Sequence, residues 1–285
     1  MNAFHNPQWI KKYNFHYPDI EYIPNYVFSS INRKLDFLSR NFPLVSIIIA
    51  AKNEEANLLS TISSIANNKT RIPIEIIVVD NNSTDRTPDI IKKLHVKSLV
   101  QPMQGCGPTR QLGLENARGQ YILTADADCL YPETWIDGMI KKLKQTNAVC
   151  VYGRYSFIGN NKTSRLKLFL YEKIKDVIAE LRNYKRPHMN SVGLNMGFIK
   201  EYMQKVGFVR RDVRGEDGRM CFDLMRYGKI VYVKNNSLRV WTGTRTLDKD
   251  GSIFRAMKLR VVKELRRLAD YIKIHPHHDT KTSHN

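Results

Sequence analysis

Short apolar runs rich in β-branched residues alternate along this chain with segments of helical periodicity. These runs lie at residues 44–50, 74–79, 96–100, 121–124 and 148–152. Runs that are apolar throughout are typical of strands buried on both faces of a sheet. Because helical segments with short connections separate them, right-handed β-α-β crossovers are expected. The sequence therefore predicts an α/β fold of Rossmann-like type, with a mainly parallel central sheet and helices on both faces.

Helix starts are predicted after several of these strands. Asn53 follows the first strand as a plausible N-cap, and Thr87 is predicted to cap a helix with Pro88 in its first turn. Further helices are expected over residues 109–117 and from Pro132 onward. Each of these helices would return the chain to the beginning of the next parallel strand.

The chain divides into three parts by composition. Residues 1–42 are rich in aromatic residues and proline, contain one short helical pattern, and are expected to form an arm that packs on the core. Residues 43–246 carry the strand–helix alternation and form one domain. Residues 247–285 are predicted to form a basic amphipathic helix followed by a disordered tail.

Charge limits the partners without choosing among them. Lysine and arginine number 46 against 27 acidic residues, so the formal charge is +19. Such an excess favours nucleic acid, an anionic membrane surface or phosphorylated ligands. Four scattered cysteines form no C-x-x-C pair, which indicates a reducing compartment rather than a disulfide scaffold. With neither a signal-peptide pattern nor a long apolar run, we expect a cytoplasmic protein, with peripheral binding to the inner face of the membrane as one alternative.

Acidic residues follow the fourth strand at a spacing of two. Asp126 and Asp128 flank the small residue Ala127, and residues i and i+2 of an extended segment point to the same side. Two such carboxylates can hold Mn²⁺ or Mg²⁺, which prefer oxygen ligands and are typically shared with substrate phosphates. A pair of exposed turn aspartates is the alternative. The position beyond a buried strand favours the metal site, because ligands of parallel sheets bind at the carboxyl ends of the strands.

Three other places along the chain offer polar groups that could bind a ligand. Asp80 ends the second strand and could accept hydrogen bonds from a base or ribose, or could merely form a turn. Arg110 follows a glycine-rich segment and could pair with phosphate, although on local grounds a solvated arginine at a helix start is the favoured alternative. Glu216 and Asp217 precede an amphipathic segment; they could cap a helix or provide a general base for an acceptor hydroxyl.

Jointly, these motifs resemble the family 2 glycosyltransferases of GT-A fold. The resemblance covers roughly residues 43–246 and rests on segments in the expected order: 45–49, 53–55, 78–85, 125–128, 193–197 and 215–217. It implies an inverting transfer of a sugar from a nucleotide-diphosphate donor to a hydroxyl acceptor, such as a lipid-linked or cell-envelope glycan. Residues 43–150 would form the nucleotide-sugar half and residues 151–246 the acceptor half.

The resemblance also implies roles for single residues. The donor would contact the following residues: Ala51, Lys52, Asn53, Glu54, Asp80, Arg110, Asp126 and Arg245. The metal would bind Asp128 directly with help from Asp126, while Asp217 would be the base and Glu216 would support the acceptor. Two features depart from many members: the chain has no Q-x-x-R-W motif with membrane helices, and Gly218 follows the acidic pair where relatives soon place another acid.

The segment 253–274 is a second informative stretch. Its apolar residues recur every three or four positions and its remaining positions are mostly basic. Such a helix can lie in an anionic membrane interface, or it can pack on the domain with its charges in water. The sequence leaves both alternatives open.

Two other functions compete with sugar transfer. A non-enzymatic nucleic-acid-binding protein would explain the charge, but the chain has no recognisable nucleic-acid-binding motif, so we expect no nucleic-acid partner. A sugar-phosphate nucleotidyltransferase would also use a metal and a nucleotide-binding sheet. It should carry a glycine-rich loop after the first strand, where this chain has Ala51-Lys52-Asn53-Glu54-Glu55.

Overall fold

The computed structural model describes residues 2–15, 17–39, 42–209 and 215–245, together with positions 247 and 262. The chain forms two compact units, Met1–Gly243 and Thr244–Asn285. Of the predicted helix at 253–274 only Val262 is described, and the predicted tail at 275–285 lies outside the described residues. Everything that follows concerns the first unit unless the second is named.

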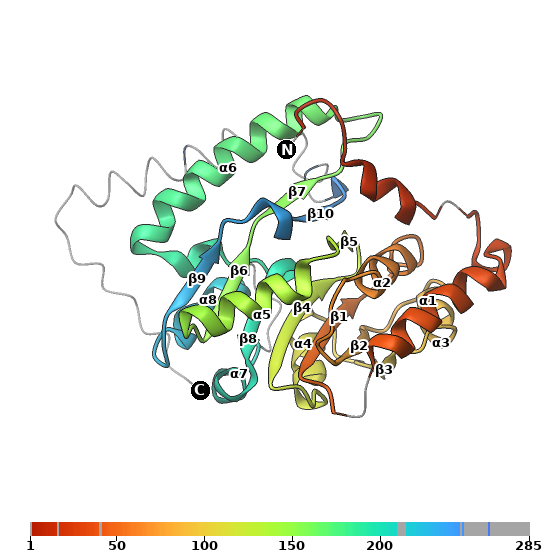
Figure 1. The fold of residues 1–285 in the computed structure, drawn as a ribbon, viewed down its shortest axis with the longest axis horizontal. Helices are drawn as coiled ribbons and strands as arrows, with labels where there is room; N and C mark the ends of the chain where they lie inside the picture. Colours follow the sequence, from red (N-terminus) through yellow and green to blue (C-terminus); the bar gives the residue numbers. More distant parts are fainter. Residues whose placement is uncertain are drawn as a thin grey trace. The chain divides into compact units, whose positions relative to one another are not determined.

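A seven-stranded sheet in the order β3-β2-β1-β4-β8-β6-β9 forms the centre of the first unit (Figure 1). Its strands are β1 (Val45–Ala51), β2 (Ile74–Asp80), β3 (Lys97–Val100), β4 (Tyr121–Asp126), β6 (Cys150–Gly153), β8 (Met196–Ile199) and β9 (Ile230–Val233). Only β8 runs against its neighbours β4 and β6, so the sheet is mainly parallel. The predicted fold class is confirmed, although β8 and β9 had no counterpart among the predicted strands.

Helices cover both faces of this sheet. The side chains of β1 show the division, since Ile47 and Ile49 belong to one apolar core and Ile48 to the other. The first core includes residues of α1 (Asn25–Leu38), α2 (Leu58–Ala66), α3 (Thr87–Lys92) and α5 (Trp135–Thr146). The second includes residues of α4 (Cys106–Glu115), α7 (Lys200–Val206) and α8 (Glu216–Leu224). Burial on both faces explains why consecutive residues of β1, β2 and β4 are mostly apolar.

A second, separate sheet has three strands in the order β5-β10-β7. Its strands are β5 (Cys129–Leu130), β7 (Tyr155–Phe157) and β10 (Val240–Thr242). The long helix α6 (Arg165–Lys185) follows β7 and packs on it. Short 3₁₀ segments complete the described chain: η1 (Gln8–Tyr13), η2 (Ile20–Tyr22), η3 (Pro187–Asn190), η4 (Gly193–Asn195) and η5 (Asn236–Leu238).

The predicted helix starts are displaced. The helix expected from residue 109 begins at Cys106, and the one expected from Pro132 begins at Trp135. The helix after β1 begins at Leu58, because Asn53 adopts a left-handed backbone with φ of 54° and belongs to the preceding loop. Thr87 is the first residue of α3 rather than its cap, and its N–H donates to Asp85 Oδ1 at 2.9 Å. Within the described part of the chain, no helix combines the length and apolar character that crossing a bilayer requires.

Candidate active site

The register of the parallel strands brings three predicted site residues to one edge of the sheet. Ala51 pairs with Asp80 across β1 and β2, and Ala50 pairs with Asp126 across β1 and β4. All three strands end at these positions, so the loops that follow them share the carboxyl edge. This is the edge where parallel sheets bind ligands.

The loop after β1 is held on the loop after β2. The Asn53 N–H donates to Ser83 Oγ at 2.9 Å, and Asn53 Oδ1 accepts from the Thr84 N–H at 2.8 Å. The Glu54 N–H donates to Thr87 Oγ1 at 2.8 Å. Asparagine tolerates the left-handed conformation that this arrangement needs. The two loops therefore form one structure, and the exposed Lys52 projects from it.

Asp80 is 4% exposed and accepts long hydrogen bonds of 3.3 and 3.4 Å from the Ser83 N–H. This is the turn-forming role that the sequence offered as an alternative, and it leaves lone pairs of the carboxylate available. The next residue, Asn81, does more than predicted. Its amide donates to the carbonyls of Gln101 and Met103 and accepts from the Gly105 N–H, which ties the β3–α4 loop to the same edge.

Asp126 and Asp128 lie close enough to share one cation. Their carboxylate oxygens and Cys129 Sγ are within 4.8 Å of one another. Burial, reinforced by the charges of the two aspartates, raises the pKa of the Cys129 thiol well above its ordinary value. The thiol therefore stays protonated, and it is a poor ligand for Mn²⁺ or Mg²⁺. The two oxygen side chains fit such a cation; the sulfur does not.

Arg110 occupies the centre of the site and contacts three carboxylates. Its Nη2 lies 2.7 Å from Asp126 Oδ1, and its Nη1 lies 3.0 Å from Asp217 Oδ1 and 3.5 Å from Glu216 Oε1. The guanidinium is 4% exposed, whereas the three acids are 15 to 33% exposed. Burial acts to lower the pKa of Arg110, but the surrounding negative charges outweigh it and hold the pKa well above its ordinary value. Arg110 is therefore a permanent cation beneath a layer of carboxylates.

Two glycines make room for this arrangement. A Cβ at Gly193 would lie 2.2 to 2.3 Å from three atoms of the Arg110 guanidinium. A Cβ at Gly107 would lie 1.7 Å from the Val209 carbonyl oxygen. The Gly193 N–H also donates to Asp217 Oδ2 at 2.8 Å, so both oxygens of Asp217 are held in place.

Local sequence reasoning missed this hub. The sequence predicts Arg110 near the donor phosphate or in water, and in the structure its two terminal nitrogens face carboxylates from two segments, β4 and α8. The only sequence signal for this contact is a glycine far from Arg110 in the chain. Gly193 leaves space for the Arg110 side chain, and that space exists only after the segment around Gly193 has packed against α4. Cys106 lies in the same region, and burial raises the pKa of its thiol to about 12, so it is not a nucleophile.

The site contains more acidic than basic side chains, which favours the binding of a cation. One guanidinium faces the carboxylates of Asp126, Glu216 and Asp217, and Asp128 adds a further acid beside Asp126. These five side chains carry a net negative charge when the acids are ionised, which a divalent ion would reduce. Arg245 belongs to the second unit, so its predicted contact with a diphosphate stays a prediction.

Comparison with known sequences gives a consistent picture. The profile described as Glycosyl transferase family 2 matches residues 46–207, more than half of the chain. An uncharacterized glycosyltransferase of Haemophilus influenzae is 31% identical over 148 residues, which are 50% of this chain and 58% of that protein. The UDP-Glc:alpha-D-GlcNAc-diphosphoundecaprenol beta-1,3-glucosyltransferase WfaP of Escherichia coli is 34% identical over 116 residues, 39% of this chain and 46% of its own. The chain thus spans about half the length of these two relatives.

Solved structures show the same architecture. The mannosyltransferase PcManGT of Pyrobaculum calidifontis, solved with GDP-Man and Mn²⁺, superposes with a TM-score of 0.54 at 16% identity. The match covers 76% of this chain and 68% of that one. At such low identity the likeness establishes the fold, which is the GT-A arrangement of a mostly parallel sheet between helices.

Proposed function

Because the chain belongs to glycosyl transferase family 2, we propose that it transfers a sugar, with inversion, from a nucleotide-diphosphate donor to a hydroxyl acceptor. The observation that carries this proposal is the group of carboxylates from Asp126, Glu216 and Asp217 around the buried Arg110. These acids come from two distant segments, yet they converge at the carboxyl edge of a parallel sheet. Family membership favours sugar transfer over nucleotidyl transfer and over nucleic-acid binding.

The donor nucleotide is proposed to lie over the joined loops after β1 and β2. Ala51, Lys52, Asn53 and Glu54 would line one side and Asp80 the other. The hydrogen bonds between backbone N–H groups and side-chain oxygens of these loops support this role, because a preformed site loses little conformational entropy when the ligand binds. PcManGT, which shares the fold, was solved in complex with GDP-Man and Mn²⁺, and a donor of that class is consistent with this proposal.

Asp128 would bind Mn²⁺ or Mg²⁺ directly, and Asp126 would assist or contact the ribose. When bound, the ion would neutralise negative charge that develops on the diphosphate leaving group. Asp126 has a firm position for this role, since its N–H donates to the hydroxyl oxygen of the buried Tyr131 at 2.9 Å. The Tyr131 hydroxyl in turn donates to the Leu194 carbonyl at 3.0 Å.

Asp217 would remove the proton from the acceptor hydroxyl as that oxygen attacks the sugar. Its two oxygens are held by Arg110 and by the Gly193 N–H, and an ionised carboxylate retains further lone pairs to accept a proton. General bases of this kind contribute about 10²- to 10⁴-fold to rate. Glu216, at 3.5 Å from Arg110 Nη1, would support acceptor binding from the first turn of α8.

Arg110 is proposed to be a positioning residue. It touches the acid on the metal side, Asp126, and the proposed base, Asp217, so it sets the distance between the two halves of the site. Its terminal nitrogens are committed to carboxylates in this structure. A direct contact with phosphate would require one of these ion pairs to open.

The proposal is tested by the products that the chain releases. We would incubate it with a panel of nucleotide sugars, Mn²⁺ or Mg²⁺, and sugar acceptors that include a lipid-diphosphate-linked glycan, the acceptor class named for the Escherichia coli relative. Release of nucleoside diphosphate with transfer of the sugar is expected, and the Asp217→Asn variant should lose at least about a hundredfold in turnover. Release of pyrophosphate instead would contradict the proposal.

A further inference from the structure

A row of apolar side chains lies exposed along α6. Its members are between 41 and 86% exposed: Leu166, Leu170, Val177, Leu181 and Tyr184. They recur at helical spacing over the whole length of the helix, on the side away from its buried residues. A contiguous apolar face of this kind indicates an interaction surface, because isolated exposed apolar residues would not align.

The charges of α6 are divided between its two faces. Its three acids are paired within the protein, Glu172 with Arg165, Asp176 with Arg239, and Glu180 with Arg154 and Lys234. Its lysines at 167, 173 and 185 are exposed beside the apolar row. The outward face is therefore apolar and basic.

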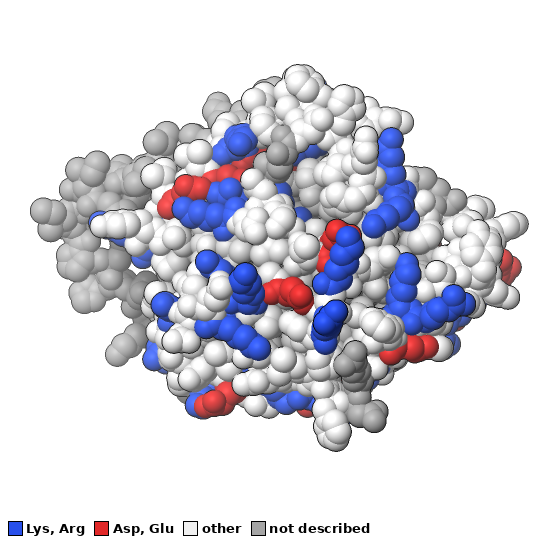
Figure 2. Space-filling view, in the orientation of Figure 1, with Lys and Arg blue, Asp and Glu red and all other residues white. Residues whose placement is uncertain are grey.

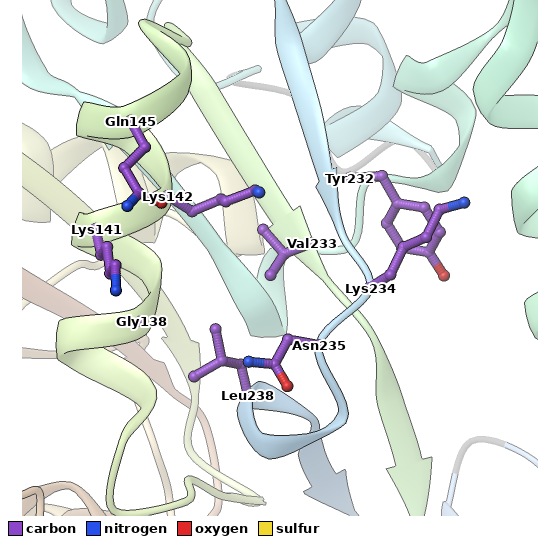
Figure 3. A pocket seen from close by; sticks show the side chains of 9 residues that line it. All are labelled: Gly138, Lys141, Lys142, Gln145, Tyr232, Val233, Lys234, Asn235 and Leu238. Carbon is purple, nitrogen blue, oxygen red and sulfur yellow. The ribbon is translucent and has the colours of Figure 1, made fainter.

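A basic cavity of about 440 Å³ adjoins this face. Lys141, Lys142 and Gln145 of α5 line one side, and Tyr232, Lys234 and Asn235 line the other (Figure 3). Lys234 Nζ lies 3.5 Å from Glu180 Oε2, so the cavity wall and α6 are in direct contact. Glu180 is three residues after Val177 and four before Tyr184, which places the C-terminal half of the apolar row next to the cavity.

We propose that α6 and the cavity between α5 and β9, here called the α6–lysine surface, dock the protein on an anionic phospholipid bilayer. The apolar side chains enter the interface while the lysines contact lipid phosphates. Figure 2 shows lysines and arginines gathered over the region of α5 and β9, with few acids among them. Charge complementarity favours an anionic bilayer over a second copy of the chain, because a two-fold interface would set like-charged lysines against each other.

This surface consists of residues other than the basic segment 253–274 that the sequence singled out, and it does not rest on the proposed sugar transfer. It would give the enzyme access to acceptors held at a membrane. The surface is also separate from the proposed donor site, since none of the cavity residues belongs to the loops after β1, β2 or β4.

Co-sedimentation of the full chain with vesicles tests the proposal. We expect binding to phosphatidylcholine vesicles that contain about 30% phosphatidylglycerol, and little binding to phosphatidylcholine alone, because each lysine near an anionic surface adds to the attraction. Raising the salt from about 0.1 M to about 0.5 M should weaken the binding, since the screening length falls.

Two double variants assign the binding to this surface. Leu170→Asp with Leu181→Asp, and Lys141→Glu with Lys142→Glu, should each weaken binding at least about tenfold. Matched controls change the same residue classes elsewhere: Tyr26→Asp with Phe37→Asp on α1, and Lys34→Glu with Lys92→Glu. These controls should bind as the unmodified chain does. Both leucines are more than half exposed, so unfolding temperatures should change little.

A reporter variant checks insertion directly. Leu181→Trp should gain fluorescence that brominated acyl chains quench, whereas Tyr26→Trp should not. Equal binding to neutral and anionic vesicles overturns the proposal. Anionic-vesicle binding that neither the leucine pair nor the lysine pair affects also overturns it, and leaves the segment 253–274 as the membrane contact. A dimer in sedimentation equilibrium that the leucine variant dissociates overturns it in favour of a second copy.

Discussion

Arg110 is the residue on which the geometry of the site depends. A buried cation with three carboxylate partners is costly to remove, because its loss leaves the three acids without the positive charge that they share. The partners come from β4 and α8, so the same contact also fixes the distance between the proposed metal side and the proposed base. Small changes near the guanidinium should therefore affect both turnover and the stability of the fold.

Gly193→Ala tests this dependence. The new Cβ would lie 2.2 to 2.3 Å from guanidinium atoms of Arg110, so the side chain must shift away from Asp126 or Asp217. We expect turnover to fall by at least about tenfold, and the free energy of unfolding to fall by about 1 to 3 kcal/mol, as for other overpacked sites. Steady-state kinetics and denaturant unfolding measure the two effects.

A double-mutant cycle separates this effect from a general disturbance. If Gly193→Ala acts through the guanidinium, adding it to Arg110→Ala should change turnover little further. Additive losses of turnover would show that the alanine acts by another route. The unfolding data serve as a control, because Arg110→Ala alone should cost about 3 to 5 kcal/mol.

Asp128→Asn addresses the proposed metal ligand. Asparagine keeps the size of the side chain but removes its charge, so metal-dependent donor binding and turnover should be lost while the fold is kept. Calorimetric titration of a nucleoside diphosphate with and without Mn²⁺ measures this. Asp36→Asn, an exposed aspartate on α1, is the matched control and should bind normally. Retained Mn²⁺-dependent binding in the Asp128 variant would place the metal elsewhere.

At the residue scale, the positions of Asp80 and Asp126 could be predicted from the sequence, but the contact of Asp126 with Arg110 could not. Asp80 and Asp126 were expected at one edge because strand periodicity alone places strand ends together, and the register of β1 with β2 and β4 does so. The roles of these residues stay predictions. The hub at Arg110 could not be predicted, since its environment is made by Gly193 and Asp217, more than eighty residues later in the chain.

At the scale of elements, a buried acid near the start of β2 forms hydrogen bonds with the segments that lead into or form β1 and β4. Glu75 of β2 accepts from Ser46 Oγ of β1 at 2.5 Å and from the Arg118 N–H, before β4, at 2.6 Å. Burial acts to raise the pKa of Glu75, but these hydrogen bonds and the Arg118 guanidinium outweigh it, so the pKa is lowered. The ionised form is thus the one that stabilises the junction of β1, β2 and β4.

Glu75→Gln should therefore show a pH-dependent loss of stability. The folded pKa lies below the unfolded value of 4.5, so the stabilisation by Glu75 is present above pH 4.5 and is lost as the pH falls through the folded pKa. Near neutral pH we expect the variant to lose about 1 to 3 kcal/mol in free energy of unfolding. The difference from the unmodified chain should shrink below pH 4.5, as measured by urea unfolding. If the difference in free energy of unfolding does not change with pH, the shape of the Glu75 side chain, and not its charge, stabilises the fold.

Among the elements, strands were easier to predict than helix starts. Runs such as 76–79 are apolar throughout because both faces of the sheet are covered, and that pattern can be read from the sequence. The start of α2 was misjudged because Asn53 has the composition of a helix cap, while tertiary hydrogen bonds to Ser83 and Thr84 draw it into a left-handed turn. Strand β8 was not predicted because it is short and antiparallel. Its residues, Met196–Ile199, do not follow the β-α-β pattern by which the other strands were recognised.

At the scale of the whole molecule, positive charge and acidic site serve different purposes. The formal charge of +19 attracts anionic ligands to the protein over distances comparable to the screening length. The site itself gathers acids, so an anionic donor should bind well there only together with a cation. The metal and the donor are therefore expected to bind with positive coupling.

Thermal unfolding of the full chain measures this coupling. A ligand that binds only the folded protein adds about 2.7 kcal/mol at a concentration about a hundredfold above its Kd. We expect a nucleotide-diphosphate sugar to raise the unfolding temperature in the presence of Mn²⁺ or Mg²⁺, and to have little effect after a chelator removes the ion. The metal alone should give a smaller rise, because Asp126 and Asp128 supply only part of its ligands. In Asp128→Asn the metal-dependent part should vanish, whereas equal shifts with and without metal would show that the donor is held by the protein alone.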